Sequence, residues 1–303
     1  MDEDCFLENE EETYTTNKKK YTGMKFKQQQ SKKESYMSFL EFGAEPSKDA
    51  PVRRVEPLGV VPWPGWRETH TESSQKNDDG PALVAHRLGP QCTLRLSSQT
   101  SPHGAGTDRI PGQYEGGFKV WSCSWDLASW LYEDSSLCAG KVVLEIGCGH
   151  AVPSIVSGAR SLILQDFNTE VLTEAVIPNL LANFESGRMR PESVTLLSCD
   201  WSQLVEYLRS NNNVTPEVVL GTDVTFTVAA CRDVAAVLST IFTTNAKAVA
   251  FIATKKYYFG TGGGVQEFTS ACQQCLGSII LLETVWSAPD RSRSILRVTK
   301  RGE

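Results

Sequence analysis

The chain has 303 residues, of which 40% are hydrophobic and 22% are charged, and its 30 basic and 36 acidic side chains give a net charge of −6. This composition supports one large or two small domains with a sizeable core, and the acidic balance argues against a protein that binds mainly nucleic-acid phosphates. No apolar stretch reaches about 18 residues, so we expect no membrane-spanning helix.

Residues 1–110 are predicted to be mostly disordered or irregular, because they are rich in charge, proline, glycine and serine. Their start, Met-Asp-Glu-Asp, is unlike a signal peptide. Seven lysines between residues 18 and 33 are interpreted either as a nuclear-import signal or as a solvated charge run. Within this region a pair of short strands is indicated by Leu83, Val84, Leu94 and Leu96.

Residues 111–303 are predicted to form one α/β domain. Apolar runs bounded by turns predict strands at 142–146, 162–165, 194–197, 218–220, 248–253, 279–285 and 295–298. Helices are expected at 121–132, 170–184, 202–209, 226–242 and 265–275. This alternation predicts a doubly wound, Rossmann-like parallel sheet with helices on both faces. The last two strands follow each other without a helix, so we expect a hairpin with an antiparallel edge strand. A seven-stranded sheet of this kind resembles that of the class I methyltransferases.

The first strand of this domain ends in a glycine turn, Glu-Ile-Gly-Cys-Gly-His-Ala at residues 145–151. Glycine at 147 and 149 lets the backbone pass close to a ligand. Asp166, about 20 residues further on, stands where an acid holds the ribose of a nucleotide-like cofactor. An ordinary strand-to-helix turn, with Asp166 near a helix N-cap, is the alternative. Ala151 occupies the position where many such sites have a third glycine.

Polar residues also follow the neighbouring strands. Glu145 could meet a cationic amine or face solvent, and Asp200 could accept a hydrogen bond from an adenine amine. Trp201 could stack on the base or belong to the core. Thr222 and Asp223 end the fourth strand. Because ligands of open α/β sheets bind beyond the carboxyl ends of the strands, these successive strand ends together predict one cofactor site.

Two longer segments, residues 114–127 and 254–265, contain the patterns Tyr-Glu-Gly-Gly-x-Lys-x-Trp and Tyr-Phe-Gly-x-Gly-Gly-Gly-Val. Together with Gln-Asp-Phe-Asn at 165–168 and Ile-Pro-Asn at 177–179, they make residues 108–300 resemble the protein-histidine methyltransferase family of the seven-strand methyltransferases. The chain departs from that pattern at Ala151, Glu217 and Asp223, where glycine, aspartate and glutamate are usual.

The resemblance implies S-adenosyl-L-methionine as the methyl donor. The strand ends and the resemblance together assign the cofactor-binding residues as Val120, Trp121, Ser122, Cys123, Ser124, Glu145, Gly147, Cys148, Gly149, Gln165, Asp166, Phe167, Asn168, Asp200, Trp201 and Thr222. The expected substrate residues are Tyr257, Tyr258, Phe259, Gly262 and Gly263, in a loop that is alternatively a flexible turn.

The expected reaction is the transfer of a methyl group to a ring nitrogen of a protein histidine. A free imidazole has a pKa of about 6.5 and is mostly neutral at pH 7, so alignment should contribute more than base catalysis. Asp223 is the candidate catalytic residue, because it could accept a hydrogen bond from one ring nitrogen and turn the other toward the methyl group. Its alternative role is to cap the following helix. The rival functions are a lysine methyltransferase of the same fold and a non-catalytic binding or assembly protein.

Large-subunit ribosomal protein three is the substrate that the resemblance implies, and the expected location is the cytoplasm and the nucleus, with the nucleolus as an option. We expect neither a nucleic acid nor a membrane as a direct partner. Nine cysteines without regular spacing indicate reduced thiols in an intracellular compartment. No metal is expected, because Cys272 and Cys275 form a Cys-x-x-Cys pair without a second pair to complete a zinc site.

Overall fold

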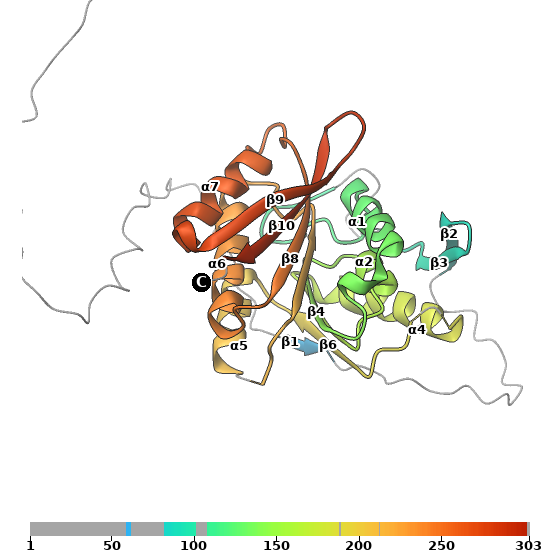
Figure 1. Cartoon of the computed structure of the whole chain (residues 1–303). Coiled ribbons are helices and arrows are strands. Elements are labelled where there is room, and N and C mark those ends of the chain that lie inside the picture. Colours follow the sequence, from blue (N-terminus) through green and yellow to red (C-terminus); the bar gives the residue numbers. More distant parts are fainter. Residues whose placement is uncertain (1–58, 62–81, 101–107, 188, 212, 302–303) are drawn as a thin grey trace, which may run out of the picture. The chain divides into compact units, whose positions relative to one another are not determined.

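The computed structural model describes residues 59–61, 82–100, 108–187, 189–211 and 213–301, and its central element is an eight-stranded sheet (Figure 1). In sheet order the strands are β1 (Gly59–Val61), β6 (Ser193–Ser198), β5 (Ser161–Asp166), β4 (Val142–Ile146), β7 (Val218–Thr222), β8 (Val249–Lys255), β10 (Arg293–Lys300) and β9 (Ile280–Ser287). The strands from β4 to β8 are parallel. At the two ends of the sheet, β10 is antiparallel to both β8 and β9, and β1 is antiparallel to β6.

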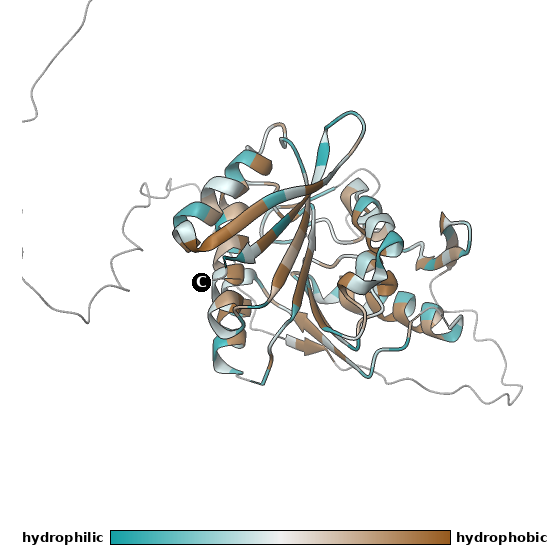
Figure 2. Cartoon of the chain, viewed as in Figure 1, coloured by the Kyte–Doolittle hydropathy of each residue, from teal (hydrophilic) through white to brown (hydrophobic). Residues whose placement is uncertain are grey.

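Helices cover both faces of this sheet. They are α1 (Ser122–Glu133), α2 (Val152–Val156), α3 (Thr169–Val171), α4 (Ile177–Glu185), α5 (Trp201–Ser210), α6 (Val228–Thr244) and α7 (Val265–Leu276). Because successive strand residues point to opposite faces, Val143 packs with α1, α2 and α4, whereas Leu144 packs with α5, α6 and α7. Figure 2 shows the apolar strands between helices whose surfaces are part polar and part apolar. No helix of the described segments is long and apolar enough to cross a membrane.

The predicted α/β fold with a mostly parallel sheet is confirmed, and so is the C-terminal hairpin. The sheet nevertheless has one strand more than predicted, because β1, from the N-terminal third, pairs with β6. The helix expected at 170–184 is divided, since a π-helical turn at Leu172–Val176 separates α3 from α4. The five-residue helix α2 was not predicted, because it is short and all of its residues are buried, so it has no polar face that would mark a helix in the sequence.

The strand pair expected around Leu83 to Leu96 is confirmed as the hairpin β2 (Leu83–Gly89) and β3 (Cys92–Ser97). Two asparagines of α4 bind the open edge of β3. Asn183 accepts from the Arg95 amide at 3.1 Å and donates to the Arg95 carbonyl at 2.7 Å, and Asn179 accepts from the Ser97 amide at 2.5 Å. The domain boundary at 110/111 stays a prediction, although these strands precede it. The basic block at 18–33 lies outside the described residues.

Candidate active site

The carboxyl ends of β4, β5, β6 and β7 meet at one edge of the sheet. Ile146 is paired with Gln165 on one side and with Gly221 on the other, and Gln165 is paired with Leu197. Along the chain, β5 and β6 are added to the sheet on one side of β4, and β7 is then added on the other side of β4. This reversal makes the edge the position at which open α/β sheets bind ligands.

Side chains of β5 hold the glycine turn after β4. The Gly147 amide donates to Gln165 Oε1 at 3.0 Å, and the Gly149 amide donates to Asp166 Oδ2 at 3.0 Å. Both glycines have a left-handed backbone, with φ of +55° and +50°. A Cβ on Gly147 would lie 2.8 Å from Cγ1 of Val224. The turn therefore requires glycine for its conformation and for its close packing.

Asp166 lies almost wholly within the protein, with 5% of its surface exposed. Burial raises its pKa to about 6, against the lowering effect of hydrogen bonds from backbone amides, and nearby Glu115 raises it further. Oδ1 accepts from the Asn168 amide at 3.1 Å, and Oδ2 accepts from Gly149. A carboxylate has about four lone-pair positions, and the amides of Gly149, Phe167 and Asn168 use three of them, so one remains for a ribose hydroxyl.

The backbone of residues 113–118, called the strap here, covers Asp166. A Cβ on Gly117 would lie 3.2 Å from Asp166 Oδ2 and 2.8 Å from Cγ2 of Val171, and a Cβ on Gly149 would lie 3.1 Å from the Gly117 oxygen. Asn168 binds the first half of the strap twice, accepting from the Glu115 amide and donating to the Gln113 carbonyl. The strap was not predicted as part of this site, because its contact with the glycine turn joins segments that are distant in the sequence.

Glu145 does not lie at the mouth of the site, as the cationic-amine interpretation expected, nor does it face solvent. It is fully buried beneath α2, where Oε2 accepts from the Ser154 hydroxyl and, at 3.1 Å, from the Ser154 amide. Oε1 has no hydrogen-bond partner. Burial raises the Glu145 pKa to about 8. The neighbouring Cys148 is also buried, and burial raises the pKa of its thiol.

The residues after β6 serve first to begin a helix. Asp200 caps α5 by accepting from the Gln203 amide at 2.9 Å, and Gln203 Oε1 accepts in return from the Asp200 amide at 3.0 Å.

Trp201 is half-buried, and its indole nitrogen donates to Gln165 Oε1 at 3.0 Å. Its ring also approaches the position of a Cβ on Gly147, at 3.8 Å. Trp201 thus contacts the glycine turn, whereas the carboxylate of Asp200 caps the helix that follows it. The half-buried Phe167 contributes its backbone oxygen, which accepts from the Ser198 hydroxyl at 3.3 Å.

Asp223 lies beside the start of α1. Its Oδ1 accepts from the Tyr258 hydroxyl at 2.7 Å and its Oδ2 from the Cys123 amide at 3.3 Å, while the hydroxyls of Ser124 and Thr222 are 2.8 Å apart. The helix-cap alternative for Asp223 is excluded, because Thr227 caps α6 by accepting from the Ala230 amide at 2.9 Å. The ends of β7 and β8 and the start of α1 therefore meet at one carboxylate.

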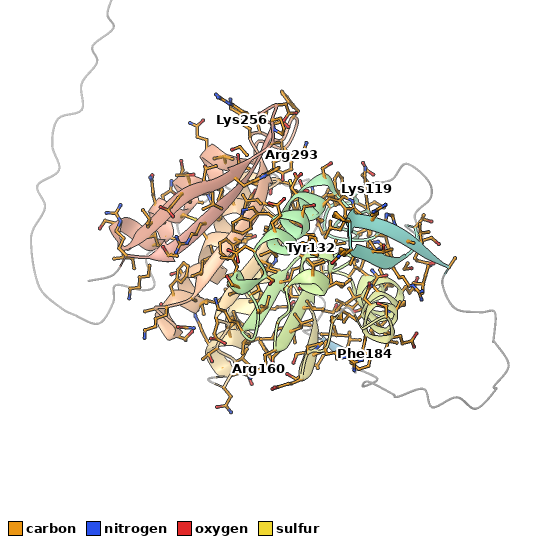
Figure 3. The ribbon with its side chains drawn as sticks, turned by 45° about the vertical axis from the view of Figure 1, so that its right-hand side comes forward. Lys119, Tyr132, Arg160, Phe184, Lys256 and Arg293 are labelled. Atoms are coloured by element: carbon orange, nitrogen blue, oxygen red, sulfur yellow. The ribbon has the colours of Figure 1, made fainter. Side chains whose placement is uncertain are left out.

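Trp121 stands between the strap and this carboxylate. Its indole nitrogen donates to the Gly116 carbonyl at 3.1 Å, and the ammonium groups of Lys119 and Lys255 lie 4.3 and 5.4 Å from its ring centroid. Val120 packs against the core on the α1 face, and Ser122 is exposed. In Figure 3, Lys119 and Lys256 lie at the same end of the molecule, whereas Arg160, just before β5, lies at the opposite end.

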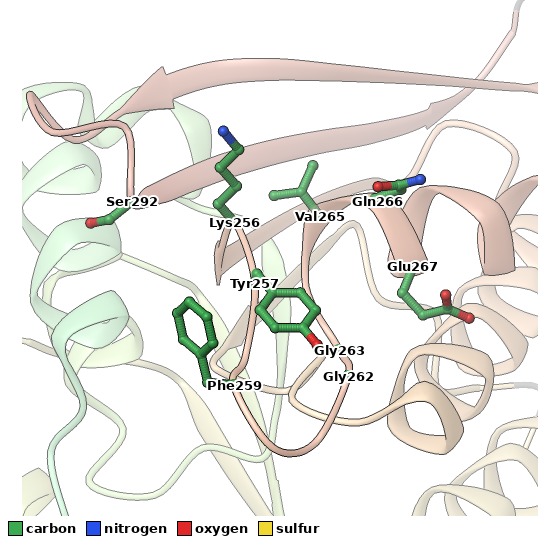
Figure 4. Close-up of a pocket in the computed structure, with 9 residues that line it drawn as sticks. All are labelled: Lys256, Tyr257, Phe259, Gly262, Gly263, Val265, Gln266, Glu267 and Ser292. Atoms are coloured by element: carbon green, nitrogen blue, oxygen red, sulfur yellow. The ribbon is translucent and has the colours of Figure 1, made fainter. Parts of the chain in front are cut away.

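The loop between β8 and α7 turns its aromatic residues in two directions. Tyr258 is 9% exposed and is directed at Asp223, whereas Tyr257 is 51% and Phe259 92% exposed. The rings of Tyr257 and Phe259 meet edge to face at 5.1 Å and border a cavity of about 660 Å³ (Figure 4). Its remaining lining comprises Lys256, Gly262, Gly263, Val265, Gln266, Glu267 and Ser292. Four of the five predicted substrate residues thus line this open surface, while Tyr258 lies on the inner side.

Comparison with known proteins supports a relationship to methyltransferases. No protein-family model matches the chain. It is 38% identical over 164 residues to a Dictyostelium discoideum protein named histidine protein methyltransferase 1 homolog, covering 54% of this chain and 50% of that protein. It is 29% identical over 196 residues to the Rattus norvegicus homolog of that name (57% and 53% covered) and 28% identical over 205 residues to histidine protein methyltransferase 1 of Schizosaccharomyces pombe (55% and 59% covered). The resemblance found in the sequence is therefore confirmed, and the chain spans about half the length of the curated relatives it matches.

The solved structures are more distant. The small RNA methyltransferase HEN1 matches with a TM-score of 0.46 at 11% identity, over 59% of this chain and 25% of that one. Magnesium protoporphyrin IX methyltransferase with bound SAH, from Synechocystis, matches with a TM-score of 0.40 at 14% identity, over 59% and 82%. At TM-scores this low, the likeness carries no argument about function.

Proposed function

We propose that this protein is an S-adenosyl-L-methionine-dependent methyltransferase that transfers a methyl group to a ring nitrogen of a protein histidine. The proposal is carried by one arrangement: the glycine turn with Asp166, and the Asp223–Tyr258 pair, stand at neighbouring strand ends of one sheet edge. The relationship to proteins named histidine protein methyltransferase supports the same reaction class.

The residues present fit the proposed cofactor. Beyond its three backbone donors, Asp166 retains a lone pair for a ribose hydroxyl, and the glycine turn brings backbone to the site without a side chain between. Trp201 offers an aromatic face beside Gly147. When bound, the cofactor supplies a methyl group on a positively charged sulfur.

The remaining task of the protein is to align the histidine. Such a transfer would place the methyl group on one ring nitrogen, leaving the cofactor sulfur neutral and the ring positively charged. Asp223 would accept a hydrogen bond from the second ring nitrogen, which orients the reacting lone pair and offsets the developing charge. Alignment of this kind contributes up to roughly 7–11 kcal/mol in favourable cases. A lysine substrate would need more, because an amine with a pKa of about 10.4 must first lose a proton.

For the substrate, we propose a protein that docks on the exposed rings of Tyr257 and Phe259, with large-subunit ribosomal protein three as the specific candidate. A surface this apolar and this exposed is typical of a protein-binding site. We further propose that the protein acts in the cytoplasm and the nucleus, where that substrate is made and assembled.

The test is incubation of the purified chain with labelled S-adenosyl-L-methionine and a lysate that lacks the activity, followed by mass mapping of the label. We expect the label on a histidine ring. Label on lysine would show the rival methyltransferase. No label, together with no thermal shift at saturating donor, would show a binding or assembly protein without activity. The Asp223→Asn variant should keep cofactor affinity and turn over more slowly; if affinity and turnover are both unchanged, Asp223 has no catalytic role.

A further inference from the structure

We propose that Tyr258 is a positioning residue: it fixes the carboxylate of Asp223 in one orientation and thereby decides which ring nitrogen of the histidine receives the methyl group. This inference rests on the proposed function. It moves Tyr258 from the substrate surface, where the sequence predicted it, to the inner side of the site.

Three hydrogen bonds define the arrangement. The Tyr258 hydroxyl donates to Asp223 Oδ1 at 2.7 Å, and it accepts from the Lys255 amide at 3.3 Å. The Cys123 amide donates to Asp223 Oδ2 at 3.3 Å. Because the Lys255 amide approaches the hydroxyl oxygen as a donor, the hydroxyl proton is directed at Asp223. Each carboxylate oxygen is thus held by a different donor, and the carboxylate plane cannot rotate freely.

The backbone of Asp223 limits the side chain further. Its φ of +54° lies in the left-handed region, which a non-glycine residue occupies only where surrounding contacts hold it. The Asp223 amide donates to the Ala253 carbonyl of β8 at 3.0 Å. With the backbone held in this way, the side chain can still rotate about its Cα–Cβ and Cβ–Cγ bonds, and the hydrogen bonds from Tyr258 and Cys123 restrict both rotations.

The glycine run of residues 262–264 explains how Tyr258 reaches Asp223. A Cβ on Gly263 would lie 2.0 Å from the Thr225 oxygen, and one on Gly264 would lie 2.6 Å from the Lys256 oxygen. The Gly264 amide donates to the Thr225 carbonyl at 3.0 Å, and the Tyr258 amide donates to the Gly263 carbonyl at 3.1 Å. These glycines let the loop lie directly against the segment after β7. The loop is therefore a close-packed support for Tyr258 rather than a flexible turn.

The chemical consequence follows from the lone pairs that remain. With one donor already on each oxygen, an imidazole N–H can approach the carboxylate only from the directions that Tyr258 and Cys123 leave open. The two nitrogens of the ring are distinct, and the one that donates to Asp223 is the one that does not react. Burial and the nearby Asp223 carboxylate raise the pKa of the Tyr258 hydroxyl, so it keeps its proton at neutral pH and donates it to Asp223. Without this donor the carboxylate could turn, and the ring could bind in either orientation.

The experiment compares Tyr258→Phe with the wild-type chain, using labelled donor and a substrate protein or lysate in which the wild-type product is found. We expect kcat to fall about 10- to 100-fold, with cofactor Kd and substrate KM changed by less than about twofold. We also expect the ratio of the two N-methylhistidine isomers in the product to become mixed. Tyr207→Phe is the matched control, because it removes a hydroxyl from α5, on the opposite face of the sheet from α1, and should leave all four quantities unchanged.

The Asp223→Asn variant provides a second, independent test, with the same measurements of isomer ratio and kcat. It should mix the isomers as Tyr258→Phe does, and the double variant should be no slower than Asp223→Asn alone, because both changes disable the same contact. If either single variant keeps the wild-type isomer ratio, or if the two losses in kcat multiply, Tyr258 is not a positioning residue. An inactive wild-type chain would instead overturn the proposed function, so the two failures are distinguishable.

Discussion

The side chains of Asn179 and His150 are in direct contact, with Asn179 Nδ2 3.2 Å from His150 Nδ1 and 3.0 Å from the His150 carbonyl oxygen. On the other side of the ring, His150 Nε2 lies 2.9 Å from the Phe118 carbonyl. Since the asparagine nitrogen can only donate, Nδ1 is the acceptor and Nε2 carries the proton. Asn179 also accepts from the Ser97 amide. One neutral histidine thus joins the glycine turn, the strap, α4 and the hairpin.

This contact predicts how stability depends on pH. Burial lowers the His150 pKa, so the unfolded chain, with a pKa of about 6.5, takes up a proton first as the pH falls. The stabilising contribution of His150 is therefore complete above about pH 6.5 and is lost as the pH falls below that value. His150→Gln should cost about 1–3 kcal/mol at pH 8, and this difference should shrink toward pH 5. Urea unfolding of both proteins at several pH values measures it.

The effect of His150 must be measured as the difference in stability between wild type and variant, because two buried acids change the stability with pH in the opposite direction. Asp166 and Glu145 have raised pKa values, of about 6 and about 8, so their contributions to stability are lost as the pH rises. Both titrate in the wild type and in the variant, and they cancel in the difference. A difference that stays constant, or grows, between pH 8 and pH 5 would contradict the assignment of a neutral His150.

Asp166 should control cofactor affinity. Loss of its charge in Asp166→Asn removes a charge-assisted hydrogen bond to the ribose, and we expect Kd for S-adenosyl-L-methionine to rise about 10- to 100-fold. In the wild type, the pKa of about 6 means that affinity should weaken as the pH falls below 6, by up to about tenfold per pH unit. Calorimetric titration at pH 8, 7, 6 and 5 tests both statements. Equal affinity at pH 8 and pH 5 would remove Asp166 from the cofactor site.

The strap should not tolerate a side chain at its closest point. In Gly117→Ala the new methyl group would meet both methyls of Val171, at 2.8 and 2.9 Å, and Asp166 Oδ2 at 3.2 Å. We expect a loss of about 1–3 kcal/mol in the free energy of unfolding, together with weaker cofactor binding. Gly59→Ala in β1 is the control, since its Cβ would have only ordinary contacts of 3.7 Å or more. Equal melting temperatures for the two variants would show that the strap does not pack on Asp166.

Phe259 should contribute to substrate binding and not to the chemical step. Its ring is 92% exposed and would become buried only against a partner, so Phe259→Ala should raise the substrate KM about 10- to 30-fold with little change in kcat. Leu281→Ala removes an apolar side chain of 40% exposure from the edge strand β9 and should leave KM as it is. Steady-state kinetics with the protein substrate separates the two constants. A fall in kcat at constant KM would place Phe259 in the catalytic step instead.

Local residue patterns were enough to predict the sheet and part of the site. Apolar runs of four to eight residues identify buried strands, because both faces of a parallel sheet are covered. The glycine turn and Asp166 were also predictable, since the geometry of a strand end restricts which residues can stand there. In the structure these two features do meet, through the hydrogen bond from Gly149 to Asp166. The third strand end was less predictable, because Asp200 has the same pattern whether it caps α5 or binds a ligand.

The sequence by itself determined where the strands lie along the chain, the glycine turn, the acids near it and the likeness to histidine methyltransferases, because each depends on residues that are close together along the chain. Only the tertiary structure decided that Glu145 is sealed beneath α2, that the strap covers Asp166, and that Tyr258 turns inward to Asp223 while Phe259 turns outward. Each of these depends on contacts between segments brought together by the packing of the whole sheet. Neighbouring residues of one loop, such as Tyr258 and Phe259, have no local signal for which of them will be buried.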